Sequence, residues 1–381
     1  MHLTLHLTTS CNLNCSYCYS PPAAGGMEMT REIIDQSLKF AIREFDTNIG
    51  VIFFGGEPLL RKDLIEYAIV KCKSMEQEEH HRFNFHFKTT TNGVLLDKDF
   101  LEFSRVAGLN IGLSIDGTQQ AHDVNRKFRN GEGSFQHLDK SIDRLLQLQP
   151  CTNAMMVVTP ENVQWYAASV NYLVTRGFRY IIASLNYDGK WESRHLKELE
   201  KQYKKIAVLY KKWTLAEKKF YFSPFEMKFA NHIRGNEDDC YSCQLSKRQI
   251  SIAPDGRIYP CVQFVKDGIS NTAYSIGNIF DGFDSNRERL FSRSVEEKEV
   301  CSTCALKKRC YNTCSCLNWQ TTGYINTVSP LLCETEQVLI PIVDRLGEEL
   351  FKRRSPMFIQ KQYNVAYPLL SMLEDEQNFV N

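Results

Sequence analysis

HLTLHLTTSCNLNCSYCYS, residues 2–20, joins an alternating apolar and polar run to three closely spaced cysteines. The alternation over residues 2–8 predicts a β-strand, because successive side chains of a strand point to opposite faces. Cys11, Cys15 and Cys18 lie in the loop that would follow this strand. Three thiols gather there without an obvious fourth, so the stretch predicts a metal centre with one open position.

An iron–sulfur cluster is the metal centre that this pattern favours. Four Cys thiolates usually hold such a cluster, so three would leave one iron open to a small molecule. A structural zinc site would close its tetrahedron with Cys or His, and no His lies between residues 7 and 21. Zinc stays open as an alternative, because spacing motifs also occur by chance.

A second motif, GGEP at residues 55–58, follows the apolar run VIFF at 51–54. Taken alone it is a tight turn, in which Gly supplies unusual φ and Pro ends the strand. Together with the CxxxCxxC spacing and the aromatic Tyr17, it resembles the signatures of the radical S-adenosylmethionine (SAM) superfamily. The resemblance implies a [4Fe–4S] cluster whose open iron chelates SAM. It also implies one-electron cleavage of SAM to methionine and a 5′-deoxyadenosyl radical that abstracts a substrate hydrogen.

Length and charge set the broad class. The 381 residues suggest one large α/β unit with an appendage. The net charge of +1 gives no basic bulk that would point to nucleic acid or an anionic membrane. No basic and apolar secretion signal opens the chain and no 18-residue apolar span occurs, so we expect a soluble cytoplasmic protein.

Fourteen Cys in such a chain indicate metal binding or redox chemistry rather than a disulfide framework. Nine of them lie between Cys240 and Cys333. Cys72 and Cys151 stand alone, and we expect both to be small buried apolar residues.

Short β-rich runs alternate with longer amphipathic stretches up to about residue 215, which indicates a parallel sheet with helical crossovers. Thr30 is the expected N-cap of a helix over 30–45. Six strand–helix pairs predict a partial (β/α)₆ TIM-like barrel, an incomplete version of the eight-stranded fold. The expected strands are 2–8, 51–54, 83–90, 109–115, 153–159 and 179–185.

The motifs fall at the carboxyl ends of the first four strands, where barrel sites are built. The three Cys follow the first strand, GGEP the second, TTNG at 90–93 the third, and SIDG at 114–117 ends the fourth. The family resemblance implies SAM-binding roles at these ends. The implied SAM-binding residues are Tyr17, Gly55, Gly56, Glu57, Pro58, Asn92, Ser114, Arg126 and Leu185.

The resemblance also implies a role for Asp116, and for Asp116 and Arg126 simpler alternatives exist. Asp116 faces ribose or substrate by resemblance, yet Asp-Gly after a strand is also a common turn device. Arg126 lies in HDVNRKFRNGEGSF at 122–135, which resembles a segment of peptide-modifying members but is equally well a solvated basic loop.

Residues 194–239 predict a long charged helix followed by a turn at FSPFE, 222–226, as a bridge between domains. The expected domains are a radical SAM barrel over 1–215, this bridge over 216–239, a Cys-rich domain over 240–345, and a helical tail over 346–381.

The Cys-rich segment resembles the SPASM domain, which carries two auxiliary [4Fe–4S] clusters. A hairpin turn at Asp255-Gly256 precedes Cys261, and CSTCALKKRCYNTC at 301–314 carries the family's spacing. A zinc ribbon is the alternative for paired CxxC motifs.

The resemblance implies two complete ligand sets, which with the first loop use eleven of the fourteen Cys. Cys316 is left over and could replace Cys314. The first set is Cys240, Cys243, Cys261 and Cys314, and the second is Cys301, Cys304, Cys310 and Cys333.

Family members with two auxiliary clusters mostly modify ribosomally made peptides. We therefore expect a peptide maturase that forms a thioether or another side-chain crosslink in a Cys-containing precursor, with a flavodoxin- or ferredoxin-like reductant. Alternatives are a sulfatase-maturase-like enzyme that oxidises Cys or Ser to formylglycine, and a non-catalytic iron–sulfur electron carrier. Auxiliary clusters suit a net oxidation because they can accept the electron left on the product.

Sulfatase maturases of this type carry an Asp base after the cysteine that corresponds to Cys261, whereas this chain has Val262. Candidate replacement bases are Asp116, Asp188 and Glu226. Because Cys11 comes so early, no winged-helix leader-binding domain is expected before it. Precursor recognition would use the barrel rim, the bridge, the tail or a partner protein.

Overall fold

A nine-stranded curved sheet forms the centre of the computed structural model, which describes residues 1–21, 26–45, 47–78, 82–234, 244–266, 272–371 and 373. The strand order is β7-β6-β5-β4-β3-β2-β1-β8-β9. Neighbouring strands pair in parallel except for the β8–β9 hairpin. The strands are β1 (His2–Thr8), β2 (Asn48–Gly55), β3 (Asn84–Thr91), β4 (Leu109–Ser114), β5 (Asn153–Val158), β6 (Tyr180–Leu185), β7 (Tyr221–Phe222), β8 (Gln249–Ile252) and β9 (Ile258–Tyr259).

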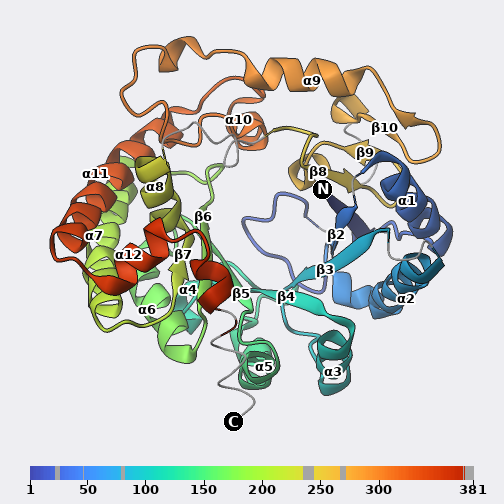
Figure 1. Cartoon of the computed structure of the whole chain (residues 1–381), viewed down its shortest axis with the longest axis horizontal. Helices are drawn as coiled ribbons and strands as arrows, with labels where there is room; N and C mark the ends of the chain where they lie inside the picture. Colours follow the sequence, from blue (N-terminus) through green and yellow to red (C-terminus); the bar gives the residue numbers. More distant parts are fainter. Residues whose placement is uncertain are drawn as a thin grey trace.

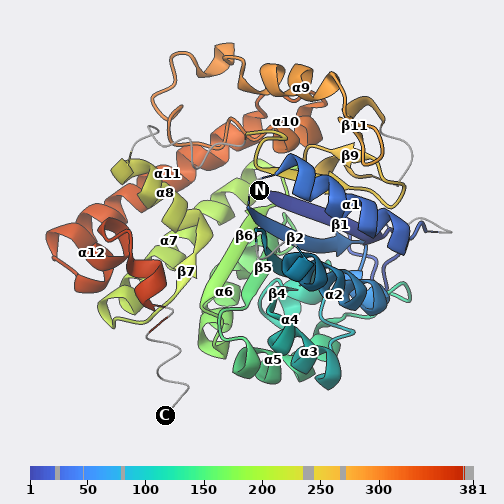
Figure 2. The ribbon, with the colours of Figure 1, turned by 45° about the vertical axis from the view of Figure 1, so that its right-hand side comes forward.

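The six predicted strands are all present, and the predicted α/β partial barrel is confirmed. Helices lie around the outer side of the curved sheet, and the segment with α9 and α10 arches from the hairpin side toward α11 (Figures 1 and 2). The helices are α1 (Arg31–Glu44), α2 (Lys62–Glu78), α3 (Lys98–Ala107), α4 (Gln119–Asp123), α5 (Phe135–Leu148), α6 (Tyr166–Arg176), α7 (Ser193–Leu215), α8 (Ser223–Arg234), α9 (Asn286–Val295), α10 (Ser315–Thr322), α11 (Pro330–Lys352) and α12 (Pro356–Tyr363).

The main core lies between the sheet and this outer layer of helices. Leu3, Leu5 and Leu7 of β1 are fully buried in it, as the alternation predicts. The helices meet the core with amphipathic faces, and α1 begins where predicted because the Thr30 hydroxyl accepts the Ile33 N–H. Burial of Cys72 is confirmed, whereas Cys151 is only half-buried.

One local prediction is wrong. Residues 222–226 do not form a turn, because Tyr221–Phe222 pair with β6 as the edge strand β7 and α8 starts directly at Ser223. Pro224 fits the first turn of a helix, where its missing N–H is not needed.

The predicted hairpin is confirmed, but it is not separate from the barrel. Gly256 adopts a φ of +83° at the turn, and β8 pairs in parallel with β1, from His2 opposite Gln249 to Leu5 opposite Ile252. The hairpin therefore extends the barrel sheet beyond β1. Cys240 and Cys243 lie outside the described residues, and the expected domain boundaries stay a prediction.

The expected helical tail is made of the end of α11 together with α12. In the described ranges, no helix combines the length and apolar character needed to cross a bilayer.

Candidate functional site

The carboxyl ends of β1, β2, β3 and β4 meet at one edge of the sheet, and the cysteine loop lies there. Backbone hydrogen bonds run from Gly56 N–H to Thr8 O (2.8 Å) and from Glu57 N–H to Ser10 O (2.9 Å). A Cβ at Gly56 would lie 2.1 Å from Ser10 O, so glycine is needed for this close approach. GGEP is thus the turn that holds the start of the cysteine loop.

Glu57 ties two of these strand ends together. Its buried carboxylate accepts hydrogen bonds from the Leu59 N–H (3.0 Å), the Thr91 hydroxyl (2.7 Å) and the Asn92 N–H (2.8 Å). Burial raises the pKa of Glu57, and these donors oppose that rise. The Asn92 side chain continues the connection by donating to Asn12 Oδ1 (2.7 Å) in the cysteine loop.

Asp116 binds the aromatic residue of the motif and an arginine. Asp116 Oδ2 accepts from the Tyr17 hydroxyl (2.8 Å) and from Arg126 Nε (3.1 Å), and Oδ1 accepts from the Val157 N–H (3.0 Å). Asp116 is completely buried and Arg126 is 6% exposed. Burial raises the pKa of Cys15 to about 11, and the Arg126 guanidinium opposes that rise. Arg126 therefore contacts the cysteine loop and is not part of a solvated basic loop.

The segment after α4 clamps the cysteine loop from the other side. Ser16 bonds Asn125 twice, from its N–H to the backbone oxygen (3.0 Å) and from its hydroxyl to Oδ1 (2.7 Å). The Asn14 N–H donates to Lys127 O (2.7 Å). The prediction had singled out this stretch only for Arg126, because hydrogen bonds between distant segments leave no local pattern.

The chemistry of the three thiols fits the cluster that the motif implies. Cys11 and Cys15 are partly buried and Cys18 is exposed, and none is in a disulfide. Burial raises the pKa of Cys11 to about 12, with the Leu13 N–H in opposition. In the part of the chain that the structure describes, no three His, Cys, Asp or Glu side chains lie at the spacing of a single metal ion.

The remaining SAM-binding candidates lie at the same edge of the sheet. Pro58 opens a short 3₁₀ turn, η1 (Pro58–Arg61), directly after Glu57. Ser114 ends β4 and Leu185 ends β6, and both are half-buried. Their SAM contacts stay a prediction.

The three candidate bases occupy different environments. Both oxygens of Asp116 are already hydrogen-bonded, as described above. Asp188 is exposed in the loop after β6, at the carboxyl edge. Of the three, Asp188 is the one that is exposed and also lies at the carboxyl edge of the sheet, where the cysteine loop lies.

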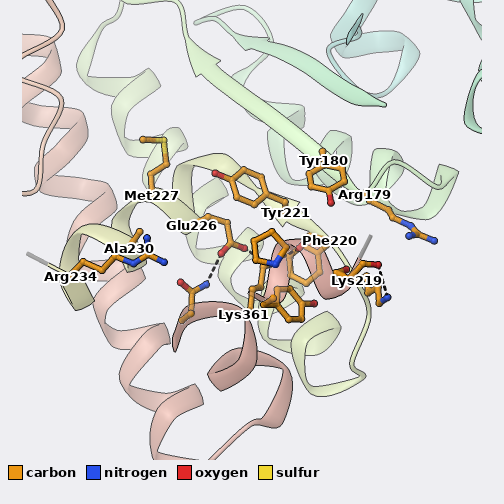
Figure 3. Close-up of a pocket in the computed structure, with 14 residues that line it drawn as sticks. Arg179, Tyr180, Lys219, Phe220, Tyr221, Glu226, Met227, Ala230, Arg234 and Lys361 are labelled. Carbon is orange, nitrogen blue, oxygen red and sulfur yellow. Dashed lines mark hydrogen bonds and ion pairs between the residues drawn. The ribbon is translucent and has the colours of Figure 1, made fainter. Parts of the chain in front are cut away.

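Glu226 lies at the opposite edge, in a cavity of about 190 Å³ beside the amino ends of β6 and β7 (Figure 3). Its carboxylate accepts from the Tyr210 hydroxyl (2.8 Å) and Gln362 Nε2 (2.6 Å) and pairs with Lys361. These contacts indicate a structural ion pair at that site.

Two cysteines of the first predicted auxiliary set, Cys261 and Cys314, lie beside Cys316. The Sγ atoms of Cys314 and Cys316 are 3.4 Å apart, and a hydrogen bond from the Cys316 thiol lowers the pKa of Cys261. Tyr19 lies near both the cysteine loop and this second group of cysteines. Burial, followed by the Cys18, Cys261 and Cys316 thiols, raises the pKa of Tyr19.

Members of the second predicted set also lie near one another. Burial, followed by Cys301 and Cys304, raises the pKa of Cys333. Burial lowers the pKa of Lys298, while Cys301 and Cys310 oppose that effect from nearby. Of the first set, only Cys261 and Cys314 are among the described residues, and the ligand role of both sets stays a prediction.

Comparison with known proteins finds a family match for the amino-terminal part of the chain. Residues 5–173 match the model of the radical SAM superfamily. This segment is a radical SAM domain. It covers β1 to most of α6, so it contains the cysteine loop and all four strand ends described above. A radical SAM domain implies SAM and one [4Fe–4S] cluster, and the Cys11, Cys15 and Cys18 thiols are the donors that would hold it.

Similarity extends beyond the radical SAM domain. A cysteine-type anaerobic sulfatase-maturating enzyme of Clostridium perfringens (strain 13) is 23% identical over 326 residues, which cover 81% of this chain and 86% of the relative. A serine-type enzyme of Klebsiella aerogenes is 22% identical over 321 residues, covering 80% and 77%. The chain is therefore similar to radical SAM maturases over most of its length.

Solved structures share the fold. Native anSMEcpe with bound AdoMet superposes with a TM-score of 0.78 at 20% identity, covering 92% of this chain and 99% of the other. Streptococcus suis SuiB bound to its precursor peptide SuiA gives a TM-score of 0.60 at 17% identity, covering 87% and 75%.

Proposed function

We propose that this radical SAM enzyme is a peptide maturase that abstracts hydrogen from a ribosomally made precursor and forms a thioether or another side-chain crosslink. The loop of Cys11, Cys15 and Cys18 carries the proposal, since these thiols lie at the strand ends in a radical SAM domain. The similarity to maturases over 80–81% of the chain supports a polypeptide substrate.

The residues around the loop would hold the cofactors in place. When bound, the [4Fe–4S] cluster and SAM supply a 5′-deoxyadenosyl radical. Asp116 and Arg126 fix Tyr17 and the Cys15 side of the loop. Glu57 and Asn92 fix the Cys11 side through Asn12. Asp188, exposed at the same edge, is the proposed base that takes the proton released by substrate oxidation.

Two auxiliary [4Fe–4S] clusters complete the proposal, with the ligand sets expected from the sequence. The neighbouring sulfurs of Cys261 and Cys314, and those of Cys301, Cys304 and Cys333, support them. A flavodoxin- or ferredoxin-like protein would supply the electron.

Formylglycine formation is the second candidate, because the relatives named above are sulfatase maturases. Val262, which has no titratable group, follows Cys261 and is packed against the core. This departure favours the crosslinking maturase.

The test is anaerobic purification with iron and sulfide analysis, followed by reaction with SAM and dithionite. We expect about twelve irons per chain, assuming three [4Fe–4S] clusters, together with 5′-deoxyadenosine. Mass spectrometry of a co-expressed Cys-rich peptide separates the two functions. A crosslink removes two hydrogens and keeps the sulfur, whereas formylglycine formation from Cys removes two hydrogens and also replaces the sulfur by an aldehyde oxygen. Zinc in place of iron, with no SAM cleavage, would overturn the proposal.

A further inference from the structure

The inner face of the curved sheet carries basic side chains and no carboxylates. Leu3, Leu5 and Leu7 pack toward the helices, so the alternate positions of β1 point inward. The registers His2–Gly50–His86 and Thr4–Ile52–Lys88 extend this phase across β2 and β3. No inner-face position of β1–β6 is Asp or Glu. The titratable side chains of that face in β1–β3 are His2, His6, His86 and Lys88.

Lys88 is a partly buried cation without an anion. The structure gives its ammonium group no hydrogen bond or ion pair to any described residue, and burial lowers the pKa of Lys88. Burial, followed by the amino terminus, Lys88 and His86, lowers the pKa of His2, so Lys88 lies among other basic groups. An unpaired buried charge is costly, and functional sites are where such groups are found.

His6 shows the same lack of a partner deeper on this face. It is 4% exposed, its ring lies edge-on to Phe54 with 5.4 Å between centroids, and its Nε2 has no hydrogen-bond partner. Solvent nevertheless reaches the inner face, because His86 and Asn110 are exposed. The outward-facing Phe85 and Phe87 are 7% and 5% exposed. The inner face is thus open to solvent at the amino ends of β3 and β4, and it carries one cation, Lys88, for which no described residue supplies an anion.

We propose that Lys88 binds a carboxylate side chain of the peptide substrate on the inner face of the sheet and selects for that acidic residue. The inference rests on the proposed function, which makes the substrate a peptide. Asn92, just after β3, marks the strand end where SAM is expected to bind and the modified residue would lie. Lys88 precedes it by four residues, about 13 Å at ~3.3 Å per residue. The Lys88 side chain spans part of that distance, and an extended peptide spans the rest with two to four residues. The acidic residue therefore lies two to four positions from the modified residue.

The test uses fluorescein-labelled 12-residue peptides with one Cys, in which Glu, Gln or Lys stands two, three or four positions from the Cys. Fluorescence anisotropy with the SAM-loaded holoenzyme measures binding. We expect a Glu peptide to bind at least about tenfold more tightly than its Gln counterpart, since charge-assisted hydrogen bonds exceed neutral ones.

Variants assign the preference to Lys88. Lys88→Met should remove it, Lys88→Arg should keep it, and Lys88→Glu should transfer it to the Lys peptide. Lys73→Met, at an exposed position of α2, is the matched control and should behave as the parent. Iron content and the urea midpoint of each variant check its folding.

Equal binding of Glu and Gln peptides by the parent would overturn the inference, as would a Glu preference that survives Lys88→Met. SAM cleavage by the parent separates the two levels. A parent that forms 5′-deoxyadenosine without a Glu preference refutes only the role of Lys88. A parent that forms none refutes the proposed function.

Discussion

Lys228 and Glu336 form a buried ion pair, with 2.6 Å between Nζ and Oε2, that joins α8 to the helix carrying Cys333. Their side chains are 0% and 4% exposed. Lys228 also donates to Arg309 O (2.9 Å) and lies 3.9 Å from the ring centroid of Tyr311. The pair thus holds the segment around Cys310 against the barrel helices.

Lys228→Met should destabilise the protein by about 3–5 kcal/mol, because it leaves the Glu336 carboxylate buried without its cation. Urea unfolding of the holoprotein measures the loss. The double variant Lys228→Met/Glu336→Leu should recover part of it, since no lone charge remains. Lys352→Met breaks the exposed pair with Glu348 and should leave the midpoint unchanged. A Lys228→Met protein as stable as the parent would show that the pair does not stabilise the fold.

His6 should make the protein less stable at mildly acidic pH. Burial lowers the pKa of His6 to about 3, from an ordinary value of 6.5. Below pH 6.5 the unfolded chain therefore binds a proton on His6 that the folded chain does not bind until about pH 3. The free energy of unfolding is unaffected by His6 above pH 6.5 and decreases as the pH falls from 6.5 toward 3.

The expected loss from His6 between pH 7 and pH 5.5 is about 1 kcal/mol, which follows from 1.36 kcal/mol per pKa unit. Urea titrations of parent and His6→Phe at the two pH values measure it, and the variant should lose less. His137→Gln, at an exposed position, is the control and should follow the parent. Identical pH slopes for the parent and His6→Phe would contradict the prediction.

Asp116→Asn should impair the cysteine loop rather than proton transfer. An amide cannot neutralise buried Arg126, and its nitrogen replaces either Oδ2, which accepts from Tyr17 and Arg126, or Oδ1, which accepts from the Val157 N–H. We expect lower iron content and 5′-deoxyadenosine formation reduced at least about tenfold, as for a loss of more than ~1.4 kcal/mol. Asp143→Asn removes the exposed partner of Arg176 and should change neither. Full iron loading with normal SAM cleavage in Asp116→Asn would exclude the positioning role.

Cys314 and Cys316 can be told apart by metal analysis. We expect Cys314→Ala to lose up to about four irons and Cys316→Ala to keep them, if Cys314 completes the first auxiliary cluster. Iron analysis together with electron paramagnetic resonance reports which cluster is affected. The opposite pattern would assign the ligand to Cys316, which is buried in the first turn of α10.

The sequence predicted the part of this architecture that is encoded locally. Strands β1–β6 appear because alternation and β-branched residues leave a pattern within six to eight residues. The gathering of the cysteine loop and GGEP at one edge followed from parallel order alone. β7 was missed because two residues are too short to show a period.

Contacts between distant segments could not be predicted in this way. Tyr17 and Asp116 are 99 residues apart, and no local signal reports their hydrogen bond. Glu226 was a candidate base by residue type, but Lys361 and Gln362 from α12 pair with it in the fold. Lys88 could not be recognised from the sequence, because a lysine in a strand is usually solvated and only the strand register places it on the inner face.

The pairing of β8 with β1 makes the two halves of the chain a single mechanical unit. A shortened protein ending at Arg234 would leave the β1 edge, from His2 to Leu5, without its hydrogen-bonded neighbour. Bare edges of this kind recruit other chains and aggregate. The radical SAM domain is therefore not a portable module, and exchanging Cys-rich segments between maturases would have to carry the β8–β9 hairpin along with the barrel it completes.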